Sequence, residues 1–315
     1  MRGSCPCSSD AQRRYGGNTS CVVLEIPGGA PIILDLGTGL RPFGDELAGV
    51  SSSAGPSPGS PEPTLGGPDS PVELTALLTH LHWDHLIGLP FFAPLRHPMT
   101  RVEVFGPPQP TGRLQDVLVD MVRPPFFPVE MADFAGHVEL TETDAGEVLA
   151  IGSAKVAVRR VPHVGVTLGF RVEAGGATVA FVSDHQRPPD GLQVDRGVLE
   201  LCDGVDLLIH DAQYSSLEFA SKVSWGHSTP TYAVHVAREA GARGLALFHH
   251  DPSHDDEEVD RLLHTAADAA VGSGITTLFA AAEGGSFTLG NGSPPGRREG
   301  PGADRSSGAK ERSDG

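Results

Sequence analysis

The stretch LLTHLHWDHLIG, residues 77–88, places His80, His82, Asp84 and His85 within six positions, between two apolar runs. Alternation at His80 and His82 points two imidazoles the same way from an extended segment, and the following Asp-His pair can reach a second point nearby. The apolar run before them indicates a buried strand, so these side chains lie at its C-terminal end, where open α/β sheets place their sites. A loop of solvated histidines would not require this HxHxDH spacing, and we therefore favour a metal site.

Further metal-binding side chains follow other apolar runs. His163 comes after RRVP, Asp184 after AFVS, and both His249 and His250 close LALFHH. Adjacent strand residues point to opposite faces, so only one of His249 and His250 would face a metal. We expect a first ion on His80, His82 and His163, a second on Asp84, His85 and His249, and Asp184 as the bridge between them.

Two adjacent ions would lower the pKa of a shared water toward neutrality and so provide a hydroxide nucleophile. The ligands alone do not choose among zinc, manganese and iron, because the same nitrogen and oxygen atoms accept several divalent metals.

The composition limits the partners. The 315 residues carry a formal net charge of −17, which disfavours extended nucleic acid because an acidic surface repels phosphates. No run approaches the ~20 apolar residues of a membrane span, and the N-terminus lacks a basic segment followed by an apolar one. Four cysteines lack zinc-knuckle spacing and the density of a disulfide scaffold. We expect a soluble, cytoplasmic protein with reduced thiols and no membrane partner.

The chain is predicted to form one domain over residues 1–290. Residues 48–71 are expected to be a flexible loop insertion and 291–315 a disordered tail, since both are rich in Ser, Pro and Gly. Early hairpins followed by alternating strands and helices indicate sheets covered by helices. We predict strands at 20–26, 31–36, 72–79, 101–106, 154–161, 167–174, 177–183, 205–210, 244–249 and 276–281. Helices are predicted over 113–122, 229–240 and 255–270, the last one capped by Ser253.

HxHxDH followed by an isolated His, an Asp and a final His resembles the metallo-β-lactamase-fold hydrolases. The resemblance runs from about Gly3 to Phe287, without the two Ser/Pro/Gly-rich segments. It implies an αββα sandwich of two mixed sheets flanked by helices, with a dinuclear, usually zinc, centre between the sheets. In that family an Asp after the second hairpin strand supports the metal loop, and Asp35 in ILDLGTG matches it.

Two further motifs resemble the phosphodiesterase branch, which includes RNase Z-type tRNA 3′-processing nucleases and phosphoribosyl cyclic phosphodiesterases. They are IHDAQY (209–214) and WGHST (225–229). The resemblance implies that Asp211 pairs with His227, that His227 protonates the leaving alkoxide, and that His249 is the last ligand. Asp84 joins this pair among the expected catalytic residues. Ser228 and Thr229 also look like a helix start before Pro230, but a cap does not account for the His.

The RYGGNTSC (14–21) and HHDPSHDD (249–256) segments resemble a bacterial subgroup of such hydrolases. Its members usually begin with a further strand-forming stretch. For the beginning of this chain we therefore expect one of two things: the first strand is truncated, or the start is misassigned. Relatives also suggest a homodimer.

The favoured function is a phosphodiesterase acting on a small-molecule or cyclic phosphodiester. RNase Z-like tRNA processing is an alternative, although the apolar segment 107–135 contains only two arginines and no basic arm. Lactonase or thioesterase chemistry is a further alternative, because a metal hydroxide also attacks acyl carbon. A non-catalytic sensor is least favoured, since the ligand set is intact. Trp83 is expected to pack beside the metal motif, with base stacking as the lesser alternative.

Overall fold

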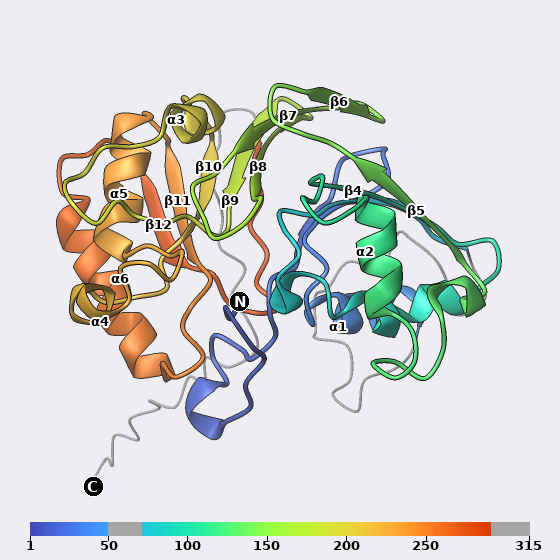
Figure 1. Ribbon diagram of the computed structural model, residues 1–315. Coiled ribbons are helices and arrows are strands. Elements are labelled where there is room, and N and C mark those ends of the chain that lie inside the picture. The colour runs from blue at the N-terminus through green and yellow to red at the C-terminus, as the bar shows by residue number, and fades with distance from the viewer. Residues whose placement is uncertain (50–70, 291–315) are drawn as a thin grey trace, which may run out of the picture.

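A computed structural model describes residues 1–49 and 71–290 (Figure 1). In the first sheet, the short hairpin predicted from the sequence pairs two strands antiparallel, and the other neighbours run parallel. Its order is β1-β2-β3-β4-β5. The strands are β1 (Val22–Leu24), β2 (Ile32–Leu34), β3 (Glu73–Leu77), β4 (Arg101–Gly106) and β5 (His137–Glu142).

The second sheet has the order β12-β11-β10-β9-β8-β7-β6. Its first four strands along the chain form an antiparallel meander, and β9 to β12 run parallel. The strands are β6 (Val148–Ile151), β7 (Ala154–Arg160), β8 (Leu168–Ala174), β9 (Ala177–Val182), β10 (Leu207–Asp211), β11 (Gly244–Phe248) and β12 (Thr277–Ala280).

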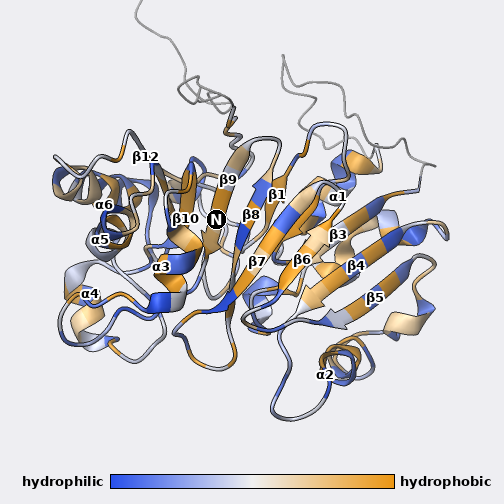
Figure 2. Ribbon diagram, turned by 90° about the horizontal axis from the view of Figure 1, so that it is seen from above, coloured by the Kyte–Doolittle hydropathy of each residue, from blue (hydrophilic) through white to orange (hydrophobic). Residues whose placement is uncertain are grey.

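The helices lie on the outer faces of the two sheets (Figure 2). The apolar interior forms three clusters: one between the sheets, around Leu77 and Phe181, and one between each sheet and its helices. Burial on both faces explains why these strands are nearly continuous apolar runs. The αββα sandwich is therefore confirmed. The helices are α1 (Leu40–Leu47), α2 (Leu114–Met121), α3 (Arg196–Cys202), α4 (Ser216–Ser221), α5 (Pro230–Glu239) and α6 (Asp256–Ala269).

Every strand and helix predicted from the sequence is present. Most are shorter than predicted, down to the three residues of β1, while β10 extends one residue further, to Asp211. β5, β6, α1, α3 and α4 were missed. The predicted cap of the last helix was wrong. Asp255 caps α6 by accepting from the Glu258 amide, while the Ser253 hydroxyl donates to Asp251 at 2.6 Å. The predicted loop 48–71 lies outside the described residues except at its two ends, and the predicted tail 291–315 lies outside them entirely. Within the described ranges, the helices are too short or too polar to cross a bilayer.

Candidate metal centre and active site

The predicted ligands meet where β3, β7, β9 and β11 end. The structure brings together one group of His80, His82, His163 and Asp184, and a second group of Asp84, His85 and His249. Within each group the candidate ligand atoms lie within 4.8 Å of one another. All seven side chains named from the sequence are thus close neighbours, although they come from segments far apart along the chain.

Asp184 faces both groups, with one carboxylate oxygen toward each. Its Oδ2 lies 3.6 Å from His80 Nε2 and 3.5 Å from His163 Nε2. Its Oδ1 lies 3.3 Å from the Nε2 atoms of both His85 and His249. This is the geometry that a carboxylate shared between two ions requires.

The second group is compact. Asp84 Oδ2 lies 3.2 Å from His85 Nε2 and 3.1 Å from His249 Nε2. In the first group, His163 Nε2 lies 3.3 Å from His82 Nδ1. Lone-pair atoms of this kind converge on a common point when a cation lies between them.

Two buried atoms in the cluster, His80 Nε2 and Asp184 Oδ1, have no hydrogen-bond partner in the part of the chain that the structure describes. A buried polar atom without a partner costs free energy, and a bound cation would satisfy both atoms. Burial lowers the pKa of His80, and it lowers the pKa of His163 to about 4. Both imidazoles are therefore neutral near pH 7, which is the form that binds metal. The residues fit a metal centre.

The carboxylates favour a positive charge at the same place. Burial alone would lower the pKa of His85, but Asp184, Asp35 and Asp84 outweigh it and raise that pKa. Burial would likewise raise the pKa of Asp184, yet the neighbouring imidazoles hold it well below its usual value. The negative potential that retains a proton on His85 also attracts divalent cations.

Hydrogen bonds behind the histidines orient them. The Nδ1–H group of His85 donates to Asp35 Oδ2 at 2.7 Å. That of His163 donates to the Gly226 carbonyl at 2.6 Å, and that of His249 donates to Gln213 Oε1 at 2.9 Å. This leaves each Nε2 facing the cluster, as metal-binding histidines require. Asp35 also accepts from the Thr79 amide and hydroxyl and from the Ser20 hydroxyl. It therefore supports the metal loop, as the resemblance implied.

The structure selects His249 rather than His250 for the cluster. His249 has a positive φ of 61°, which turns its side chain toward Asp84 just after β11. His250 points elsewhere, with Nε2 donating to the Ala281 carbonyl at 3.1 Å. Non-glycine residues rarely adopt this conformation, and such strain concentrates at functional sites.

Asp211 and His227 form a pair beside the cluster. His227 Nδ1 lies 2.8 Å from Asp211 Oδ2, and the Asp211 carboxylate also accepts the backbone amides of Gln213, Ser228 and His185. Burial would lower the pKa of His227, but Asp211, Asp184 and Asp84 outweigh it and raise that pKa. The imidazole can therefore hold a proton next to the cluster. Thr229 caps α5 with Pro230 at its first position, so the helix start and the Asp211–His227 pair coexist.

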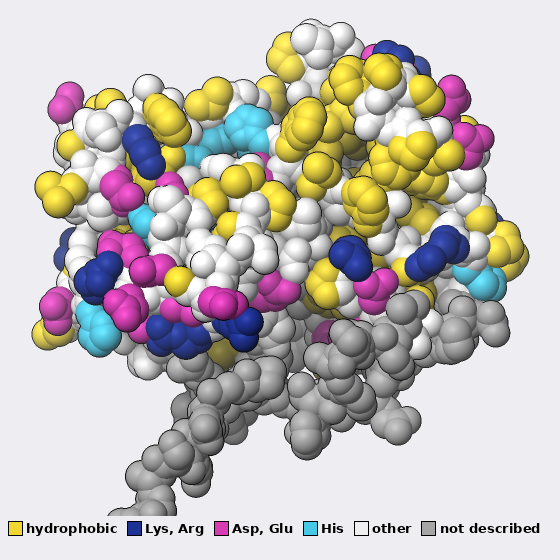
Figure 3. Space-filling model, turned by 90° about the horizontal axis from the view of Figure 1, so that it is seen from below, with side chains coloured by type: hydrophobic (Ala, Val, Ile, Leu, Met, Phe, Trp, Pro, Cys, Tyr) yellow, Lys and Arg dark blue, Asp and Glu magenta, His cyan; other side chains and the backbone are white. Residues whose placement is uncertain are grey.

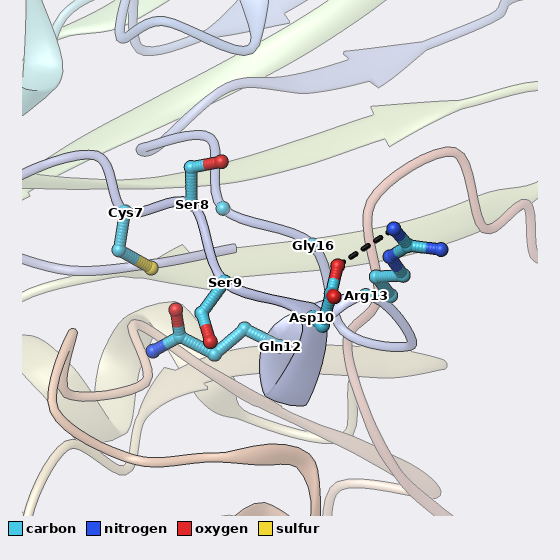
Figure 4. Close-up of a pocket in the computed structure, with 8 residues that line it drawn as sticks. Cys7, Ser8, Ser9, Asp10, Gln12, Arg13 and Gly16 are labelled. Carbon is cyan, nitrogen blue, oxygen red and sulfur yellow. Dashed lines mark ion pairs between the residues drawn. The ribbon is translucent and has the colours of Figure 1, made fainter.

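A cavity of about 710 Å³ opens over the cluster, and its lining includes Asp84, Asp184 and His227. In the space-filling view, histidine side chains gather in a hollow with hydrophobic side chains around it (Figure 3). A second cavity of about 370 Å³ lies in the N-terminal segment, lined by Cys7, Asp10 and Arg13 among others (Figure 4). Arg13 there is paired with Asp10 at 2.6 Å, and the described residues of this lining include no histidine. The chemistry belongs to the first cavity.

Sequence reasoning missed three contributors to the centre. Gln213 holds His249, and the Ser4 amide donates to Asp84 Oδ2 at 2.7 Å. A Cβ added at Gly3 would lie 2.4 Å from the His249 ring, so the N-terminal segment packs directly against a ligand. Gln213 follows Asp211 by two positions, and residues two apart in an extended segment point to the same side. This spacing was the one signal that could have placed Gln213 near the centre. Nothing in the sequence pattern places residues 3 and 4 near the centre.

Comparisons with known proteins agree with this geometry. Residues 52–250 match the model of the beta-lactamase superfamily domain. Ribonuclease Z of Lactococcus lactis subsp. lactis is 27% identical over 228 residues, which cover 57% of this chain and 71% of that protein. Unliganded yeast PDE1 has a TM-score of 0.61 at 15% identity, covering 90% of this chain and 97% of that one. A diphosphatase from the PhnP family has a TM-score of 0.59 at 17% identity, covering 90% and 92%.

The chain belongs to the beta-lactamase superfamily domain family. With its His/Asp cluster suited to metal ions, it is a metal-dependent hydrolase of that superfamily.

Proposed function

We propose that this hydrolase is a phosphodiesterase with two zinc ions that acts on a small or cyclic phosphodiester. The observation that carries the proposal is the Asp211–His227 pair, whose histidine lines the same cavity as Asp184 and Asp84. A phosphodiester needs a proton at its leaving oxygen as the bond breaks, and a carboxylate-held histidine can supply one. The ribonuclease and the diphosphatase among the similar proteins support phosphate chemistry by their names.

The cluster residues would hold the ions as two sites, with Asp184 between them. When bound, such a pair of ions activates a water and neutralises charge on a phosphate group. Asp211 keeps the His227 ring in one orientation through Nδ1, so Nε2 is the nitrogen that can donate to the departing alkoxide. Asp35 and Gln213 keep His85 and His249 turned toward the cluster. Manganese and iron would fit the same nitrogen and oxygen ligands, and metal analysis decides among them.

Transfer-RNA processing is the weaker candidate, although the sequence relatives named above include a ribonuclease Z. Both arginines of segment 107–135 are paired locally with acidic side chains, Arg113 with Asp116 and Arg123 with Asp120, each at 2.9 Å. Within residues 1–49 and 71–290, the cavity lining includes no Lys or Arg. RNA binding depends on basic side chains that contact phosphates, so a small substrate suits this surface better.

The test is hydrolysis of bis(p-nitrophenyl) phosphate and of a precursor tRNA by the metal-loaded protein, with metal content measured on the same sample. We expect turnover of the diester and none of the tRNA. His137→Ala is the matched control for the His227→Ala variant, because His137 is exposed at the start of β5 and away from the centre. A protein that holds its metals and ignores the diester would contradict the proposal and turn attention to esters, lactones and thioesters.

A further inference from the structure

Both tryptophans of the chain lie at the metal cavity. They are Trp83, inside the metal loop, and Trp225, two residues before His227. Both line the 710 Å³ cavity, and their exposed fractions are 66% and 60%. A single exposed apolar side chain is ordinary, but two large indoles over one cavity are an apolar surface that calls for a ligand.

The backbones that carry the two indoles are fixed. The Trp83 carbonyl accepts the amides of Leu86 and Ile87 at 3.2 and 2.9 Å. Next to Trp225, Gly226 donates from its amide to Gln186 at 2.7 Å and accepts from His163 at 2.6 Å. Trp83 directly follows His82 in the chain, and Trp225 is tied through Gly226 to His163. An indole on such a support can bind a flat ring with little loss of conformational entropy.

Lys222 restrains Trp225 further. Its ammonium lies 5.5 Å from the Trp225 ring centroid and 4.3 Å from that of Tyr214, and it is paired with Asp251 at 3.3 Å. A cation over the face of an indole is attracted to its π-system. This contact favours one placement of the Trp225 ring while most of its surface remains open to solvent.

We infer that the substrate carries a nucleobase that stacks on Trp83 and Trp225, so that the phosphodiester belongs to a small nucleotide. This rests on the proposed phosphodiesterase function and narrows its substrate class. Among the described residues, the cavity lining holds two carboxylates and no Lys or Arg, so affinity for an anionic substrate depends on the metal ions, on His227 and on stacking. Stacking is suited to this task, because every base has a π-face and stacking on aromatic side chains contributes substantially to binding.

Intrinsic fluorescence tests the inference directly, since the chain has only these two tryptophans. The metal-loaded protein is titrated with adenosine 5′-monophosphate and, separately, with ribose 5-phosphate, which lacks only the base. We expect adenosine monophosphate to quench the emission at concentrations about tenfold lower than any effect of the sugar phosphate. Equal responses to the two ligands, or no response to either, would overturn the inference.

Variants identify the residues. Trp83→Ala and Trp225→Ala are each expected to weaken binding of the nucleotide about tenfold. Binding to each variant is followed by the fluorescence of the tryptophan that remains. Trp225→Phe keeps a flat ring and should recover most of the affinity. Phe126→Ala is the control, because Phe126 is an exposed aromatic residue outside the cavity lining. Unchanged affinity in both alanine variants would contradict the assignment.

The two proposals fail differently. If wild-type protein cleaves bis(p-nitrophenyl) phosphate but does not distinguish nucleotide from sugar phosphate, the nucleobase site is wrong and the phosphodiesterase stands. If the nucleotide quenches the emission but no diester is cleaved, the nucleobase site stands and the phosphodiesterase is wrong. In kinetics, the ratio of kcat/KM for a nucleoside 2′,3′-cyclic phosphate over glycerol 1,2-cyclic phosphate should fall about tenfold in each alanine variant.

Discussion

His227 donates from Nδ1 to Asp211 Oδ2 across 2.8 Å, while the remaining acceptor positions of that carboxylate are filled by backbone amides. Replacing His227 by Ala should lower kcat for a diester by about 10²- to 10⁴-fold, because the proton donor is lost while the ligands stay in place. The measurement is steady-state kinetics together with metal content. His227 also lies in a group with Asp184 and His249, so loss of a metal in this variant would show that it is a ligand instead.

The pH profile of the same pair should shift when the charge of Asp211 is removed. A histidine acting as an acid is active below its pKa, and activity falls as the pH rises through it. Burial lowers the pKa of His227 and the Asp211 carboxylate raises it. In Asp211→Asn the raising charge is gone, so the pKa of His227 should fall. The alkaline limb of kcat should therefore move to lower pH. If the alkaline limb does not move in Asp211→Asn, the group that titrates there is not His227.

Gln213 should control metal affinity without contacting the metal. Replacing it by Leu removes the acceptor that orients His249, and such outer partners typically change metal affinity about 10- to 100-fold. Competition with a chromogenic chelator measures this loss. Gln115→Leu, on the exposed side of α2, is the matched control. Equal affinity in the two variants would mean that Gln213 has no positioning role.

Removal of metal should lower the melting temperature. The buried carboxylates of Asp84 and Asp184 lose their counter-charge when the ions leave, and the lone pair of His80 Nε2 is left without a partner. A ligand that binds only the folded state stabilises it by mass action, so added zinc should restore the transition in a concentration-dependent way. Differential scanning calorimetry with and without chelator measures the change. Identical melting curves would contradict a metal-stabilised core.

Gly88 should tolerate no side chain. A Cβ at this position would lie 2.0 Å from the Gly37 carbonyl oxygen, which is part of the backbone that supports the metal loop. Gly88→Ala should therefore destabilise the fold by about 1–3 kcal/mol, the usual cost of overpacking. Urea unfolding measures it. Gly290→Ala is the control, because a Cβ there meets open space and the residue has no positive φ. This substitution should leave the free energy of unfolding unchanged.

The sequence was most informative where chemistry restricts residue type. HxHxDH and the strand-end His163 and Asp184 could be recognised because metal ligands need particular side chains at particular spacings. The resemblance favoured His249 over His250, but strand alternation alone left the choice open, since it does not foresee a residue with φ 61° directly after β11. The roles of Gln213 and Ser4 depend on contacts between segments far apart along the chain, which no local pattern contains.

The missed elements have different causes. β5 lies at the edge of its sheet and alternates exposed polar residues with half-buried apolar ones, a period-two signal for a strand that was overlooked. α1 contains Pro42 and Gly44, both poor helix formers, and is stabilised instead by packing of Leu40 and Leu47 in the core. Tertiary contacts overrode helix propensity in α1.

The order in which the ligands occur along the chain has a consequence for biosynthesis. His80 follows a strand of the first sheet and His249 belongs to the last third of the sequence, and the backbone of Arg2 pairs with His250. The ligands of the first group are all made once Asp184 has been added, but a ribosome must complete β11 before the second group gains His249. Until then the nascent chain carries a partial, histidine-rich site, and completion of the two-ion centre becomes one of the last events in maturation rather than a nucleus for it.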